Sequence, residues 1–183
     1  MRRPFIETLT KLAEKDSKVI LIIGDVGFSF IEPFKERFPN QFLNCGVLEQ
    51  TMMGLAVGMA RVGWKPYVYT MKNFILLRPL EQVRNDICFG KANVKLFGVG
   101  GSAAYKFLGY SHNLQDGEEE KILSTLPNLN TYFPKTEEEA VKNIEKIGTQ
   151  YAEAKALSWL MQEQRKVVLA TEAAKSEAKS AIA

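Results

Sequence analysis

The chain has 183 residues, of which 46% are hydrophobic and 25% charged, and its formal net charge is +3 at pH 7, as is typical of one globular domain with a sizeable core. This charge is spread along the chain and few aromatic residues accompany the Lys and Arg residues, so nothing favours nucleic-acid binding. No apolar run is long enough for a membrane span or a signal peptide, so we expect no membrane contact. Cys45 and Cys88 lack metal-ligand spacing, so we expect reduced thiols and a cytoplasmic protein.

Helical and extended patterns alternate along the first half of the chain. Apolar residues at helical spacing predict a helix over residues 5–15, and the continuous apolar run of residues 18–24 predicts a buried parallel strand that ends in a loop. Further helices are predicted over residues 31–38 and 49–62, and further strands over residues 41–44 and 67–70, with residues 64–66 as a connector.

The alternation continues in the second half. Helices are predicted over residues 75–89, 118–126 and 136–147, strands over residues 94–99 and 128–133, and a loop over residues 105–117. Thr136 is expected to be the N-cap of the last of these helices, with Glu139 at its third position. Strands that alternate with helices in this way predict an α/β domain of three layers, α/β/α, with a mostly parallel sheet.

The pattern changes near residue 148. Residues 151–166 have the spacing of one more amphipathic helix, and residues 167–170 have the composition of a last strand of the same domain. Residues 172–183 are rich in Ala, Lys, Glu and Ser and predict a frayed helix or a disordered tail. We therefore expect one domain over residues 1–147, a final helix and strand within residues 148–171, and a polar tail.

Candidate binding residues follow several of the predicted strands. In open α/β sheets, ligands bind beyond the carboxyl ends of the strands. The loops and helix starts at this edge offer five side chains, which are Asp25, Glu49, Phe74, Arg78 and His112. Glu49 is the most informative, because it stands where a short apolar run becomes a helix of small and apolar residues, and burial of an unpaired carboxylate is costly. It either caps the helix that it opens or binds a ligand.

The other candidates have ordinary structural explanations. Phe74 fits a core position as well as a ligand contact, and His112, in a polar loop, is a weak signal by itself. The glycines of residues 98–101 lack the spacing of a known phosphate loop. Gly54 and Gly58 favour close helix packing rather than chemistry.

The sequence resembles the pyrimidine-binding domain of the transketolase family over residues 4–147. The most specific block is residues 38–50, FPNQFLNCGVLEQ. Support comes from DVG at residues 25–27, GWKPYVY at 63–69, NF at 73–74, RPLEQVRND at 78–86, NVK at 93–95, GYSH at 109–112 and LPN at 126–128. Within the family, the chain is most similar to the separately encoded C-terminal subunits of split transketolases, especially those of sugar and surface-polysaccharide pathways.

The resemblance implies a role in thiamine diphosphate chemistry. In the family, the glutamate that matches Glu49 hydrogen-bonds the aminopyrimidine of the cofactor and favours its imino tautomer. The imino nitrogen then deprotonates the thiazolium carbon, and the cofactor serves as an electron sink. Phe74 matches the aromatic residue that stacks on the pyrimidine. His112 matches a histidine that faces the substrate hydroxyls or the reacting centre, and Asp25 matches a position near the cofactor and the dimer seam.

The same resemblance implies a partner. The family's diphosphate-binding domain, with its Gly-Asp-Gly motif and its asparagine for Mg²⁺, has no counterpart in this sequence, so we expect a partner subunit to complete the sites for the diphosphate and the metal, with no metal ligand on this chain. We expect a homo- or hetero-oligomer that transfers a two-carbon ketol unit between sugars. Met71 and Leu108 stand where other residue types are common in the family, which leaves a non-catalytic assembly or scaffold remnant as the alternative.

Overall fold

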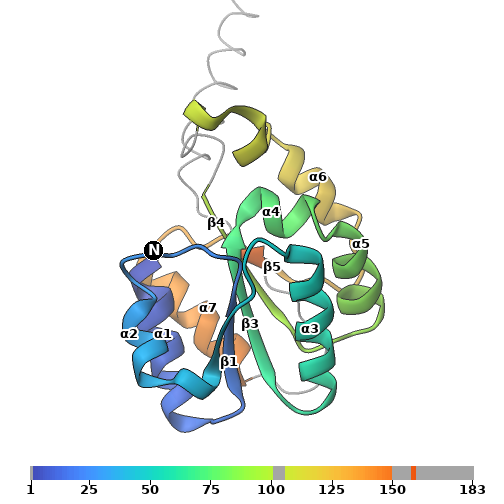
Figure 1. The fold of residues 1–183 in the computed structure, drawn as a ribbon. Helices are drawn as coiled ribbons and strands as arrows, with labels where there is room; N and C mark the ends of the chain where they lie inside the picture. Colours follow the sequence, from blue (N-terminus) through green and yellow to red (C-terminus); the bar gives the residue numbers. More distant parts are fainter. Residues whose placement is uncertain (1, 101–105, 150–157, 160–183) are drawn as a thin grey trace, which may run out of the picture.

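The computed structural model describes residues 2–100, 106–149 and 158–159. Its centre is a sheet with helices on both faces (Figure 1). The helices are α1 (Arg2–Lys15), α2 (Glu32–Arg37), α3 (Glu49–Arg61), α4 (Lys72–Leu77), α5 (Leu80–Gln82), α6 (Glu118–Ser124) and α7 (Glu137–Thr149), with 3-10 turns η1 (Pro39–Gln41) and η3 (Lys106–His112) and a π-helical segment η2 (Val83–Phe89). The strands are β1 (Val19–Ile23), β2 (Phe42–Asn44), β3 (Lys65–Met71), β4 (Lys95–Val99), β5 (Thr131–Tyr132) and β6 (Ser158–Trp159).

The described strands form one parallel sheet in the order β2-β1-β3-β4-β6-β5. This confirms the prediction of a three-layer α/β domain with a mostly parallel sheet. Ile23 at the end of β1 is in register with Asn44 of β2 and with Tyr69 of β3. The carboxyl ends of these three strands therefore lie side by side, and the segments that follow them share one edge of the sheet.

The two faces of the sheet build two apolar cores. Strand β1 is buried along its whole length, and its side chains alternate between the faces, as a parallel strand covered on both sides requires. Ile20 and Ile22 pack in the core beneath α3, whereas Leu21 and Ile23 pack in the core beneath α1, α2 and α7. Figure 1 shows α1, α2 and α7 on one side of the sheet and α3, α4 and α5 on the other.

The predicted helix over residues 75–89 differs most from the structure. Helix α4 begins earlier, at Lys72, and ends at Leu77. A short α5 and the π-helical η2 follow. Pro79 explains the interruption, because proline has no backbone N–H to donate and its ring obstructs a regular helix. The break leaves Arg78 at the C-terminal end of α4, at the same sheet edge as the other candidate residues.

Smaller differences occur elsewhere. Strand β3 includes Lys65 and Pro66, which were predicted to lie in a connector, and the predicted loop over residues 105–117 contains the turn η3. Thr136 is the N-cap, as predicted, because its hydroxyl accepts the backbone N–H of Glu139 at 3.2 Å. The Glu139 carboxylate accepts the backbone N–H of Lys135 instead of closing the capping box.

The C-terminal prediction is wrong at one described point. Strand β6 occupies residues 158–159, inside the range predicted as a helix, and it pairs with both β4 and β5. A two-residue strand is too short for hydrophobic periodicity to distinguish it from a helical segment. Pairing with the neighbouring strands β4 and β5 therefore decides the conformation here, rather than the local spacing of apolar residues. The predicted strand at residues 167–170 and the polar tail at 172–183 lie outside the described residues.

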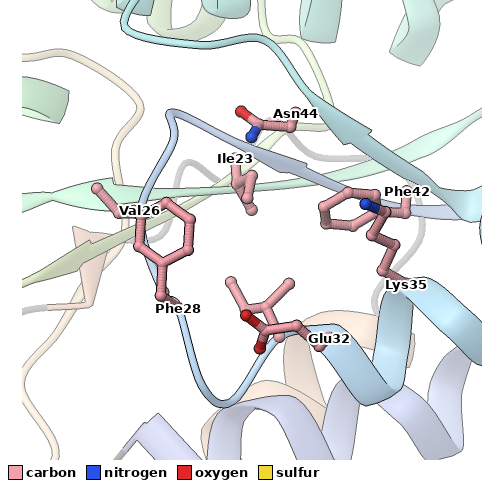
Figure 2. A pocket seen from close by; sticks show the side chains of 9 residues that line it. Ile23, Val26, Phe28, Glu32, Lys35, Phe42 and Asn44 are labelled. Atoms are coloured by element: carbon pink, nitrogen blue, oxygen red, sulfur yellow. The ribbon is translucent and has the colours of Figure 1, made fainter.

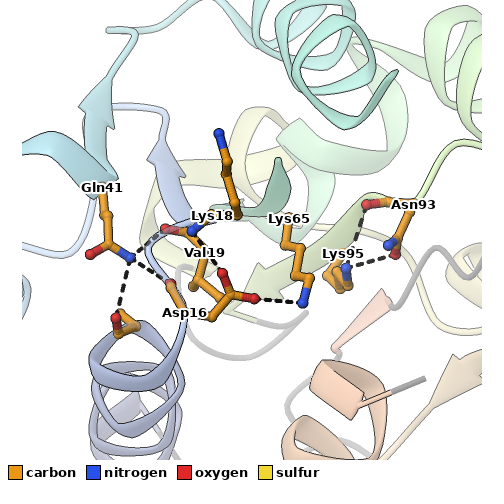
Figure 3. Close-up of polar contacts among 8 residues, drawn as sticks. Asp16, Lys18, Val19, Gln41, Lys65, Asn93 and Lys95 are labelled. Carbon is orange, nitrogen blue, oxygen red and sulfur yellow. Dashed lines mark hydrogen bonds and ion pairs between the residues drawn. The ribbon is translucent and has the colours of Figure 1, made fainter. Parts of the chain in front are cut away.

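A polar cluster lies at the opposite edge of the sheet, where the strands begin (Figure 3). Lys65 pairs with Asp16 at 2.5 Å, and Gln41 donates to the backbone carbonyls of Asp16 and Val19 at 3.0 and 2.8 Å. Lys95 is 2% exposed and donates to the side chain of Asn93 at 2.7 Å. Burial lowers the pKa of Lys95 to about 7, and the nearby charge of Lys65 adds a smaller lowering effect. The carboxylate of Asp16 acts in the opposite direction.

The lowered pKa of Lys95 predicts a pH-dependent stability. Above pH 7 the unfolded chain binds a proton at Lys95 that the folded chain does not, so the free energy of unfolding should rise with pH, by at most about 1.4 kcal/mol per unit. Urea titrations between pH 7 and 9 should show this rise, and Lys95→Met should flatten it. The exposed Lys11→Met variant is the matched control, and parallel pH profiles for Lys95→Met and the parent chain would refute the assignment.

Candidate active site

Glu49 is the first residue of α3 and lies close to the end of β2. Its side chain is 3% exposed. No side-chain hydrogen bond caps the start of α3 at Leu48, and the Glu49 carboxylate accepts its hydrogen bonds from Arg78 rather than from a helix N–H. The explanation of Glu49 as a helix cap therefore has no support from its contacts.

Arg78 connects the carboxylate to the aromatic candidate. Its Nη1 donates to Oε1 and Oε2 of Glu49 at 2.8 and 3.0 Å. The central guanidinium carbon lies 3.5 Å from the ring centroid of Phe74, a close cation–π contact. Phe74 is 7% exposed, so it is a buried residue whose ring nevertheless offers a face to a polar group. Core packing and ligand contact are therefore compatible for this residue.

His112 completes this group of side chains. Its ring meets the Phe74 ring edge-on, with centroids 5.1 Å apart. The turn that carries it is anchored to α4, because the Asn73 amide donates to the Ser111 carbonyl at 2.5 Å. The Ser111 hydroxyl donates to the Leu108 carbonyl at 3.0 Å and lies 2.6 Å from Nδ1 of His112. Because that hydroxyl has one hydrogen, the arrangement favours a hydrogen on Nδ1 of the histidine.

The structure thus gathers Glu49, Phe74, Arg78 and His112 into one cluster, which we call the carboxylate cluster. Its members come from α3, from α4 and the residue after it, and from η3, which are brought together by the shared carboxyl edge of the sheet. The cluster combines a buried anion, an aromatic face and an imidazole. A flat group that donates N–H to the carboxylate and stacks on the aromatic ring suits this set, as the planar guanidinium of Arg78 demonstrates.

Asp25 is placed elsewhere. Its carboxylate accepts the amide N–H of Asn44 at 3.0 Å, and its backbone N–H donates to the Asn44 side-chain oxygen at 3.1 Å. These contacts fasten the loop after β1 to the end of β2. Asp25 and Asn44 both lie outside the carboxylate cluster. The contacts of Asp25 therefore favour a role in organising the loop after β1 at this edge of the sheet.

A pocket that sequence reasoning missed lies beside Asn44 (Figure 2). It is open and mainly apolar, with a volume of about 100 Å³, and lies between the loop after β1, α2 and the end of β2. Phe28 forms one wall and is 70% exposed. The sequence sign of this pocket is Phe28, an apolar aromatic residue in the same loop as Asp25.

A buried ion pair joins α4, which carries Phe74, to α6. Lys72, the first residue of α4, pairs with Glu119 of α6, and their side chains are 6% and 8% exposed. Burial raises the pKa of Glu119 to about 7, against the opposing effect of Lys72. The pair ties α6 to the helix that carries Phe74 and was not foreseen from the sequence, in which both residues resemble ordinary surface charges.

Within the described ranges, His, Cys, Asp and Glu side chains do not gather in any group of three that could hold a metal ion. No described helix has the length and hydrophobicity to cross a membrane. Of the glycine stretch at residues 98–101, Gly100 is buried and Gly101 lies outside the described residues.

Comparisons with known proteins agree with this architecture. The family described as "Transketolase, pyrimidine binding domain" matches residues 1–147. The chain is 34% identical over 134 residues to a subunit of the apulose-4-phosphate transketolase of Phocaeicola vulgatus, an alignment that covers 73% of this chain and 42% of that protein. It is 36% identical over 135 residues to 1-deoxy-D-xylulose-5-phosphate synthase of Bacillus cereus, covering 73% of this chain and 21% of that protein.

A solved structure described as "Split gene transketolase, inactive beta4 tetramer" superposes with a TM-score of 0.74 at 27% identity, over 86% of this chain and 50% of that chain. The chain therefore spans half or less of the length of these relatives.

Proposed function

The chain belongs to the family of transketolase pyrimidine-binding domains, and from this premise we propose that it is the pyrimidine-binding part of a thiamine diphosphate-dependent, transketolase-like enzyme. The proposed reaction is transfer of a two-carbon ketol unit between sugars. The proposed active form contains a partner that carries the diphosphate-binding domain. Two relatives from different bacteria are each named as one subunit of an apulose-4-phosphate transketolase, which supports both the chemistry and the partner.

One observation carries the proposal. Glu49 is almost fully buried, and its carboxylate and the ring face of Phe74 jointly hold a flat nitrogen cation. An aminopyrimidine is also flat and nitrogen-rich, so the donor set fits that half of the cofactor. We assign the diphosphate and Mg²⁺ to the partner, as the resemblance to the family implies.

Each residue of the cluster then has a role. When bound, thiamine diphosphate supplies an acidic carbon and an electron sink. Glu49 would hold a proton shared with a ring nitrogen, and its burial would keep water from competing for that proton. Phe74 would support one face of the ring. His112, whose ring lies edge-on to that of Phe74, would contact the substrate hydroxyls. Asp25 would organise the neighbouring loop near the subunit seam.

The partner surface is proposed to include the face of α3 that carries Gly54 and Gly58, and the segment before the helix. Val47 and Leu48 are 60% and 57% exposed. On α3, a side chain added at Gly54 or Gly58 would meet no described residue outside the helix's own backbone within 4 Å. The close packing predicted for these two glycines is therefore not made with the described residues, and an exposed apolar surface beside small residues suits close packing against another subunit.

This surface gives a direct prediction. Gly58→Ala should leave assembly intact and stabilise α3 by up to about 1 kcal/mol, because alanine favours a helix over glycine. Gly58→Arg should fold as well but weaken subunit association at least about tenfold, since its side chain would project into the interface. Sedimentation velocity over a concentration series measures both effects. Unchanged association of the Gly58→Arg variant would exclude this face of α3.

The function itself is tested by reconstitution. The chain, a candidate diphosphate-binding subunit and their mixture are assayed for two-carbon transfer from a ketose phosphate in the presence of thiamine diphosphate and Mg²⁺. We expect transfer only in the mixture. A mixture that forms a stable complex but neither binds the cofactor nor turns over would favour the alternative, an assembly subunit without chemistry, to which the departures at Met71 and Leu108 already point.

A further inference from the structure

Arg78 has no assigned role in the proposed chemistry, yet it makes the closest contacts in the carboxylate cluster. We propose that Arg78 gates the cofactor site: its guanidinium occupies the place of the pyrimidine ring on Glu49 and Phe74, and it must swing out for the cofactor to bind. This inference rests on the proposed function. It adds a regulatory step, because binding becomes an exchange of one flat nitrogen group for another.

The first argument is the space on Phe74. The guanidinium carbon of Arg78 lies 3.5 Å from the ring centroid of Phe74. This is about the contact distance of two carbon atoms, so no other flat group can enter between them. Arg78 and a ring stacked on the same face of Phe74 therefore exclude one another.

The second argument is the hydrogen bonding of Glu49. Nη1 of Arg78 lies within hydrogen-bond distance of both carboxylate oxygens, at 2.8 and 3.0 Å. A ring nitrogen that donates to Glu49 from the same face of Phe74 would compete with Arg78 for one of those oxygens. Because Glu49 is 3% exposed, loss of Arg78 without replacement would leave a buried carboxylate unpaired, which is costly. Arg78 should therefore leave only as another donor arrives.

The third argument is that Arg78 can leave. Its side chain is 39% exposed while that of Glu49 is almost fully buried, so the guanidinium reaches the carboxylate from the solvent side. Arg78 follows the last residue of α4 and precedes Pro79, outside the regular helices. Rotation of a long, flexible side chain at such a position requires no movement of the sheet or of α3.

The decisive experiment measures cofactor binding rather than turnover. Thiamine diphosphate with Mg²⁺ is titrated into the complex of this chain and its diphosphate-binding partner, with the parent chain, Arg78→Ala, Arg78→Lys and Arg84→Ala. Arg84 is the matched control, because its guanidinium also lies over an aromatic ring, Phe89 at 4.8 Å, but on the surface and away from the cluster. We expect Arg78→Ala to bind the cofactor at least about tenfold more tightly and to associate faster, and Arg84→Ala to match the parent.

Arg78→Lys separates charge from shape. Its ammonium can still pair with Glu49 but cannot lie flat on Phe74, so its cofactor affinity should fall between those of the parent and Arg78→Ala. If Arg78→Ala does not fold, the cofactor affinity of Arg78→Lys tests the proposal by itself. If both variants bind the cofactor more weakly than the parent, Arg78 positions Glu49 in the bound state and the gate is refuted.

A second readout uses no cofactor chemistry. Ethylguanidinium, at millimolar concentration, should raise the thermal unfolding midpoint of the Arg78→Ala chain by replacing the lost group, and should not raise that of the parent or of Arg84→Ala. It should also compete with thiamine diphosphate in the Arg78→Ala complex. Absence of this selective effect would overturn the placement of the guanidinium on the ring's site.

The proposed function and the gate fail in different ways. If no mixture binds thiamine diphosphate, the proposed function is wrong and the gate falls with it. If the parent complex binds the cofactor and Arg78→Ala binds it no more tightly, the proposed function stands and the gate alone is wrong.

Discussion

Replacing Glu49 with glutamine is expected to abolish turnover of the assembled enzyme while the chain remains folded. The amide has nearly the size of the carboxylate but cannot share a proton with a ring nitrogen, and removal of such a proton-transfer group typically costs about 10²- to 10⁴-fold in rate. Folding should survive, because the amide oxygen can still accept a hydrogen bond from Arg78, whose side chain is 39% exposed and can also turn to water.

This prediction is measured with the reconstituted complex. The ketol-transfer rate of Glu49→Gln is compared with that of Glu81→Gln, an exposed carboxylate of α5 outside the cluster. Circular dichroism and sedimentation establish that both variants fold and assemble. Turnover of Glu49→Gln within about twofold of the parent would remove Glu49 from the chemistry.

The second large effect concerns the buried pair of Lys72 and Glu119. Lys72→Met should lower the free energy of unfolding by about 3–5 kcal/mol, because it leaves a buried carboxylate without its cation. The double variant Lys72→Met/Glu119→Leu should recover most of this loss, since replacement of both charges by apolar groups removes the desolvation cost. The exposed pair Arg3–Glu7, with side chains 87% and 55% exposed, is the control, and Arg3→Met should change the free energy of unfolding far less than Lys72→Met does, because water solvates both of its charges.

The same pair predicts the direction of a pH effect. The pKa of Glu119 is raised by burial, so this group stabilises the fold fully at low pH, and its contribution is lost as pH rises through about 7. Without Lys72 the pKa should rise further. The loss in Lys72→Met should therefore be smaller at pH 5 than at pH 8 in urea titrations. A loss independent of pH, with no recovery in the double variant, would show that the pair is not a buried ion pair.

The sheet was accessible from the sequence because its signals are local. The apolar run of β1 and the strand–helix alternation predict parallel strands, and parallel strands place their following segments at one edge. That reasoning nominates Asp25, Glu49, Phe74, Arg78 and His112 together. The last four form the carboxylate cluster, whereas Asp25 contacts Asn44 instead.

The pairing within the site was not accessible in this way. The contact between Arg78 and Glu49 joins residues 29 positions apart, and it depends on the break in the helix at Pro79. The signal was present, because a proline inside a helical pattern usually interrupts the helix, but the predicted helix over residues 75–89 ran through it. The burial of Lys72 and Glu119 depends on how α4 and α6 pack, and charged residues give no sequence sign of being buried.

The measurement that tests the central claim most directly is a calorimetric titration of thiamine diphosphate and Mg²⁺ into this chain, into a diphosphate-binding subunit, and into their mixture. We predict binding only in the mixture, and loss of that binding in Glu49→Ala. Absence of binding in a mixture that sedimentation shows to be a complex would contradict the account, as would tight binding to this chain alone.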